Sequence, residues 1–168
     1  MADKPSLKFE DEPVRQIVSD WWTGLKEDRG GWAELRRCRS IEEVFNCQAY
    51  FDLYRALQKL AEVGRVQLEA AAGLVAHVRS DATEARSLAW CMAESRPDSG
   101  RAKVSDLRFR RLLKIENRQE LYPSLIRILR LLKYRAPVVS LANDVYYWGS
   151  AVRRRWAYDY YTNAPELG

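Results

Sequence analysis

Five cationic side chains gather in one stretch of twelve residues, LRFRRLLKIENR at positions 107–118. They are Arg108, Arg110, Arg111, Lys114 and Arg118, with Glu116 as the one acid. Cations at this density suit phosphate binding, since they attract a polyanion and release its counterions without reading bases. At 100° per residue, Phe109, Leu112 and Leu113 share one helix face and the cations spread over the rest. The stretch predicts an amphipathic helix with a cationic face; a merely solvated surface is the competing interpretation.

Positive charge is concentrated in the second part of the chain. The net charge is +5, but residues 1–98 carry 14 basic and 17 acidic residues, whereas residues 99–168 carry 14 basic and 6 acidic residues. Eleven of the latter 14 are arginines, which form bidentate contacts with phosphate and stack on exposed bases. This asymmetry predicts a polyanionic partner for the second part.

The residues that usually carry catalysis are scarce. His77 is the single histidine and lies in an apolar helical stretch, so we expect a structural role for it. Cys38, Cys47 and Cys91 are odd in number and form no CxxC motif, so we expect buried reduced thiols. The acids are scattered, and no phosphate-binding loop is present. The sequence therefore predicts a protein that is not an enzyme, with no cofactor and no metal.

Helical spacing of apolar residues dominates the chain, and eight glycines and six prolines leave little turn chemistry for a β protein. We expect an all-α fold of about nine helices in two packed helical bundles. SRPDSGR at 95–101 is the clearest break, and the charge balance changes there. The predicted organisation is a flexible acidic leader over 1–12, an N-terminal helical bundle over 13–98 and a basic C-terminal helical bundle over 99–168.

The start MADKPSLKFEDEP is charged and has no signal-peptide character, and no apolar run approaches the ~20 residues of a membrane span. We therefore expect a cytoplasmic protein with no membrane partner.

Two further predicted helices of the second part have one apolar and one basic face, LYPSLIRILRLLKYR at 121–135 and AVRRRWAYDYY at 151–161. The inward positions are Leu121, Leu125, Ile128 and Leu132 in the first and Val152, Trp156 and Tyr160 in the second. The outward arginines are Arg127 and Arg130 in the first and Arg153 and Arg154 in the second. The spacing favours Trp156 and Tyr160 as core residues over base-stacking platforms. Pro123 fits the first helix only in its first turn.

A sequence-reading helix-turn-helix protein is the natural competitor for a basic helical chain. No short helix pair with Asn or Gln at base-reading positions is present. Two alternatives to a non-specific nucleic-acid-binding subunit stay open. One is a free helical DNA-binding regulator that prefers one duplex and binds it as a dimer. The other is a structural adaptor whose basic face meets an acidic protein.

Short motifs follow one another in a definite order along the chain. They are WW..L at 21–25, DRGGWAELRRC at 28–38, SGR at 99–101, RFRRLL at 108–113, LIRILRLL at 125–132, DVYYWG at 144–149 and RRRWAYDYY at 153–161. Their ordered combination resembles the CasB family, the small subunit of Cascade, the type I-E CRISPR surveillance complex. The resemblance covers roughly residues 14–161.

The resemblance implies an all-helical, non-catalytic protein with an N-terminal and a C-terminal bundle. It implies two copies side by side, and as partners the repeated backbone subunit that holds the guide RNA and the large subunit. A basic face would help hold the opened target DNA, including the displaced strand. By resemblance this role falls on Arg36, Arg37, Arg108, Arg111, Lys114, Arg118 and Arg153.

Charge pattern and resemblance together give ten candidate nucleic-acid-binding residues. They are Arg36, Arg37, Arg108, Arg111, Lys114, Arg118, Arg127, Arg130, Arg153 and Arg154. One region departs from the expected pattern: between Arg79 and Gly100 the acids outnumber the bases, so we expect no nucleic-acid contact there.

Overall fold

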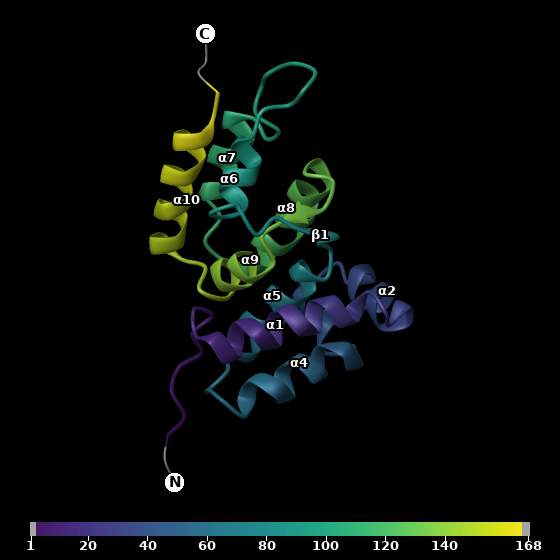
Figure 1. Ribbon diagram of the computed structural model, residues 1–168. Coiled ribbons are helices and arrows are strands. Elements are labelled where there is room, and N and C mark those ends of the chain that lie inside the picture. Colours follow the sequence, from purple (N-terminus) through teal and green to yellow (C-terminus); the bar gives the residue numbers. More distant parts are fainter. Residues whose placement is uncertain (1–2, 166–168) are drawn as a thin grey trace.

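The computed structural model describes residues 3–165, and over this range it is helical with one minimal sheet (Figure 1). The ten helices are α1 (Glu12–Leu25), α2 (Arg29–Arg37), α3 (Ile41–Val44), α4 (Gln48–Gln58), α5 (Arg65–Val75), α6 (Leu88–Ala93), α7 (Asp106–Leu113), α8 (Arg118–Leu131), α9 (Val138–Tyr146) and α10 (Ser150–Asn163). The two strands are β1 (Ser80–Asp81) and β2 (Arg135–Ala136). The predicted all-α class is confirmed, with ten helices in the described part of the chain against about nine expected. No helix within residues 3–165 is both long and apolar enough to cross a membrane.

Helix α5 lies in the middle of the molecule and packs against α3, α4, α8 and α9. Figure 1 shows α1, α2 and α4 on one side of it and α6, α7 and α10 at the other end. Small residues allow this central position, because Ala70, Ala71, Ala72 and Gly73 are all buried. A Cβ atom on Gly73 would lie 2.3 Å from the hydroxyl oxygen of Tyr122, so glycine is needed there for α8 to approach α5.

The minimal sheet ties the α8–α9 connection to the segment that follows α5. Its two strands run parallel, with Ser80 opposite Arg135 and Asp81 opposite Ala136. The Asp81 carboxylate also accepts a hydrogen bond of 3.0 Å from the backbone N–H of Val138 at the start of α9. These contacts fix the C-terminal end of α8 and the N-terminal start of α9 relative to the α5–α6 connection.

The start of the chain is anchored over its described part, residues 3–11. Leu7 and Phe9 are buried, and the backbone N–H of Glu62 donates to the Pro5 carbonyl over 2.8 Å. The hydroxyl of Tyr147 donates to the Leu7 carbonyl. The flexible acidic leader expected over 1–12 stays a prediction. Burial of the two apolar side chains stabilises the docked position of the described residues.

The division at residues 98 and 99 into two bundles stays a prediction. The packing crosses it, because α6 precedes the break and packs against α10, which follows it. The buried apolar residues of the described chain also form one continuous cluster.

The apolar faces predicted for α8 and α10 are confirmed. Leu121, Leu125, Ile128 and Leu132 are buried, as are Val152, Trp156 and Tyr160. Pro123 lies inside α8, not in its first turn. The reason is the position of the cap: the Asn117 side chain accepts a 2.8 Å hydrogen bond from the N–H of Glu120, and this starts the helix at Arg118.

Candidate nucleic-acid interface

Helix α7 is held on the core by its apolar face and is capped at its start. The Ser105 hydroxyl accepts from the backbone N–H of Arg108 over 3.3 Å, the bond expected of an N-cap serine. Phe109 is fully buried and stacks on Tyr160 of α10, with ring centroids 4.0 Å apart and an interplanar angle of 7°. This anchoring leaves Arg108 and Arg111 exposed on the opposite face of the helix.

Helix α8 presents a second exposed pair of arginines beside α7. Leu125 and Ile128 are buried on its inner face, whereas Arg127 and Arg130 are exposed. Arg127 is steadied by a 3.3 Å contact from its guanidinium to the Ser124 hydroxyl.

The two exposed pairs meet across one groove of about 570 Å³, the α7–α8 groove. It is lined by Arg108, Arg111, Leu112, Ile115, Glu120, Ser124, Arg127, Ile128, Arg130 and Leu131. Four arginines thus face one acid. Within residues 3–165 none of the four arginines forms an ion pair. The sequence separates the two pairs by about twenty positions, and the fold brings them to the lining of one groove.

Three further candidates are exposed but lie outside this groove. They are Arg37 at the end of α2, Lys114 at the C-cap of α7 and Arg154 on α10. Arg154 points outward, as its helical position predicts.

Arg118 does not present its guanidinium to the groove. Its Nε and Nη2 atoms donate to the carbonyls of Val145 and Tyr146 over 3.0 and 2.6 Å. These carbonyls end α9, where helix carbonyls lack intrahelical partners and the helix dipole favours a cation. Burial lowers the pKa of Arg118 from its ordinary value. In this structure the guanidinium of Arg118 therefore caps α9, and the nucleic-acid contact expected of it from sequence stays a prediction.

Arg153 is also turned inward, although the sequence predicts an outward position. Its Nη1 atom donates to the carbonyl of Leu113 over 3.1 Å, and its Nε atom is buried without a hydrogen-bond partner in the described chain. Leu113 is the last residue of α7, so the contact again caps a helix end and joins α10 to α7.

Arg36 lies on the face of α2 beside a tryptophan. Its guanidinium sits 4.2 Å from the ring centroid of Trp32, a cation–π contact. The Trp32 indole N–H donates to the carbonyl of Ala76 over 2.6 Å, which brings Arg36 toward the buried His77. Burial, together with Arg36, Arg130 and Arg79, lowers the pKa of His77 to about 4. Sequence reasoning missed Arg79, which stacks on Tyr134.

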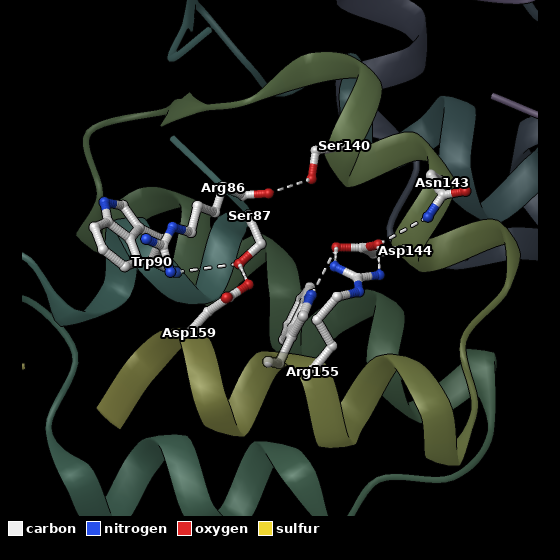
Figure 2. Close-up of polar contacts among 9 residues, drawn as sticks. Arg86, Ser87, Trp90, Ser140, Asn143, Asp144, Arg155 and Asp159 are labelled. Atoms are coloured by element: carbon white, nitrogen blue, oxygen red, sulfur yellow. Dashed lines mark hydrogen bonds and ion pairs between the residues drawn. The ribbon is translucent and has the colours of Figure 1, made fainter. Parts of the chain in front are cut away.

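The position of α10 depends on a buried carboxylate that the sequence did not single out (Figure 2). Asp144 is fully buried in α9 and pairs with both terminal nitrogens of Arg155, at 2.5 and 3.3 Å. The indole N–H of Trp156 and the amide of Asn143 also donate to it, over 2.7 and 2.9 Å. A buried carboxylate is stable only with such partners, so these contacts lock α9 and α10 together.

A second polar contact joins α10 to α6. The Ser87 hydroxyl donates to the Asp159 carboxylate over 2.8 Å and accepts from the backbone N–H of Trp90 at the start of α6 (Figure 2). Asp144 thus joins α9 to α10, and Asp159 joins α10 to the start of α6.

The three cysteines are buried free thiols, as predicted. The sulfur atoms of Cys38 and Cys47 lie 3.5 Å apart, and burial raises the pKa of both thiols above the ordinary value. Within residues 3–165 no group of three or more His, Cys, Asp or Glu side chains is arranged to hold a metal ion.

The chain matches the family model described as CRISPR-associated protein Cse2 over residues 31–161, more than three quarters of its length. It also matches a chain in the crystal structure of E. coli Cascade bound to a PAM-containing dsDNA target with a 32-nt spacer. That match has a TM-score of 0.68 and 20% identity, and covers 91% of this chain and 97% of that chain, so it supports the fold. No curated protein matches the chain in sequence. The chain belongs to the Cse2 family of CRISPR-associated proteins, the same family as the CasB proteins that its motifs resemble.

Proposed function

We propose that the protein is a non-catalytic small subunit of a type I-E CRISPR RNA-guided surveillance complex, Cascade. It binds nucleic acid through the α7–α8 groove and stabilises the target DNA and its displaced strand. The observation that carries the proposal is the convergence of Arg108, Arg111, Arg127 and Arg130 on that groove without an ion-pair partner in the described chain.

The spacing of these cations suits a phosphate backbone. Arg108 and Arg111 are three residues apart on α7, as Arg127 and Arg130 are on α8, so each pair rises by about 4.5 Å along its helix. Like charges that converge repel one another unless an anion lies between them. The groove therefore favours a polyanion, and arginine suits its phosphates because it can bind them in bidentate fashion.

The same groove supports binding without base sequence preference. Its lining includes no Asn or Gln, the residues that read adenine by paired hydrogen bonds. Contacts to phosphate position a strand but carry no sequence information. A subunit of this kind leaves target selection to the guide RNA.

Membership of the Cse2 family supports the assembly part of the proposal. The structural relative is part of a Cascade bound to target DNA. By this likeness the partners are the repeated backbone subunit, the large subunit, a second copy of the chain, the guide RNA and the target DNA.

Co-purification tests the proposal. The tagged chain is expressed with the other type I-E Cascade subunits, with and without a guide RNA. We expect it to elute in a stoichiometric complex that contains guide RNA. Elution alone in both conditions, with a preference above about a hundredfold for one duplex in gel shifts, would support the free regulator, since specific readers commonly exceed non-specific binding by ~10³ or more.

A further inference from the structure

A second basic depression, the α7–α10 hollow, lies next to the α7–α8 groove and has a volume of about 1210 Å³. It is built from the loop that follows α6, the start of α7 and the end of α10. Four arginines and two aspartates line it, so its charge is positive. Arg108 lines both depressions, which makes them neighbours across α7.

Tyr161 of α10 is the aromatic side chain that lines this hollow and is also exposed. Half of it is accessible, at 51%, whereas its neighbour Tyr160 is 2% exposed. Its hydroxyl donates to the carboxylate of Asp106 over 2.5 Å. Burial and this hydrogen bond raise the pKa of Tyr161 to about 12, so the ring stays neutral at physiological pH.

The ring of Tyr161 is held in place by core aromatics. Its centroid lies 5.9 Å from Phe109 and 5.1 Å from Tyr160, with interplanar angles of 77° and 81°. Edge-to-face contacts of this kind stabilise one orientation of the ring. With its hydroxyl also fixed, Tyr161 loses little conformational freedom when a ligand packs on it.

The chemistry of the hollow favours an unpaired nucleobase as the ligand. Bases stack on aromatic side chains whatever their identity, because every base has a π-face. Leu107 of α7 lines the same hollow and is 52% exposed, which adds apolar surface beside the ring. Arg101 and Arg108, which form no ion pair within residues 3–165, supply the charge for the phosphates that flank a base.

We propose that Tyr161 stacks on an unpaired base of a single strand whose phosphates continue past Arg108 into the α7–α8 groove. This inference rests on the proposed function and extends it, since it makes single-stranded nucleic acid the ligand of this surface. The buried Trp156 and Tyr160 take no part in the stacking, because neither ring is accessible.

The test compares two probes, an oligothymidine and an abasic oligonucleotide of the same length, each titrated with the full-length chain. Tyr161→Ala and Tyr161→Leu remove the aromatic face, and Tyr161→Phe keeps it without the hydroxyl. Tyr158→Ala is the matched control, because Tyr158 is 67% exposed on the same helix but does not line the hollow. Melting curves show which variants are folded.

We expect Tyr161→Leu to weaken oligothymidine binding about tenfold, the order of one base–aromatic stack, and to leave abasic binding and the salt slope unchanged. Tyr161→Phe and Tyr158→Ala should bind like the parent chain. Equal losses on both probes, or no loss on either, would overturn the stacking while leaving phosphate binding in the groove intact. Unchanged DNA affinity with lost entry into the complex would make the hollow a protein-docking surface and also overturn it. A parent chain that binds neither probe in low salt would refute the proposed function as well.

Discussion

Arginine has two different roles in two regions of the molecule, the α7–α8 groove and the α9–α10 junction. The junction consists of Asp144, Trp156 and the three arginines that hold α9 and α10 in place, Arg118, Arg153 and Arg155. In the groove, four arginines are exposed and lack ion-pair partners within residues 3–165. At the junction, Arg118 and Arg153 donate to carbonyls at helix ends, and Arg155 pairs with the buried Asp144. Cation density alone therefore does not identify a binding surface. The oxygen acceptors that packing brings near each guanidinium decide whether it can meet a ligand.

The largest expected effect is the loss of stability when a buried residue of the junction is removed. Trp156→Ala should lower the free energy of unfolding by about 3–5 kcal/mol, because the side chain is fully buried and its indole N–H bonds Asp144. Tyr158→Ala, on the same helix but exposed, should change it by less than about 0.5 kcal/mol. Urea unfolding of both variants measures the difference. A stable Trp156→Ala protein with impaired nucleic-acid binding would place Trp156 in the interface.

The second expected effect is a loss of stability at low pH, caused by the buried imidazole of His77 beside the arginines. The pKa of His77 is about 4 in the folded chain, below its ordinary value of about 6.5, so the unfolded chain binds a proton first as the pH falls. Stability from this group is complete above pH 6.5 and falls by about 3 kcal/mol between pH 7 and pH 4.

Unfolding of the parent chain and His77→Gln at pH 7, 5 and 4 tests this pH dependence, since other acids titrate alike in both proteins. The parent should lose more stability than the variant as the pH falls. Parallel losses would mean that His77 is not held neutral in the folded chain.

Adjacent arginines on α10 offer a matched pair. Arg155→Ala should cost about 1.5–3 kcal/mol, the range for hydrogen bonds to a charged group, because it leaves the Asp144 carboxylate short of two donors. Arg154→Ala should be nearly neutral, since Arg154 is exposed. Thermal or urea unfolding compares the two. Equal stability changes in the two variants would mean that the pairing of Arg155 with Asp144 adds nothing to stability.

Helical periodicity was enough to predict the all-α class and the inward faces of α7, α8 and α10. Phe109 and Trp156 illustrate why: each has apolar neighbours at helical spacing, and each is fully buried. Periodicity also placed Arg127 and Arg130 outward, as the structure has them.

The inward turns of Arg118 and Arg153 could not be predicted in the same way. Their acceptors lie 27 to 40 positions away along the chain, at helix ends that become neighbours only when the helices pack. Asp144 was missed for a related reason, because its nearest charge partner is eleven residues away in the next helix. Leu7 and Phe9 were too few, within an acidic segment, to predict that the start of the chain is docked.

We propose that the exposed arginines of the groove bind phosphate. The salt dependence of target-DNA affinity in the reconstituted complex measures this phosphate binding. The variant Arg111→Ala/Arg127→Ala removes one cation from each wall, and Lys59→Ala/Arg65→Ala removes the same charge from exposed positions at the end of α4 and the start of α5. Both should unfold within about 0.5 kcal/mol of the parent. The groove variant should flatten the slope of log affinity against log salt by about 1.4 for a single strand, and the control should leave it unchanged. Equal slopes in all three complexes, with normal assembly, would show that the groove arginines do not bind phosphate.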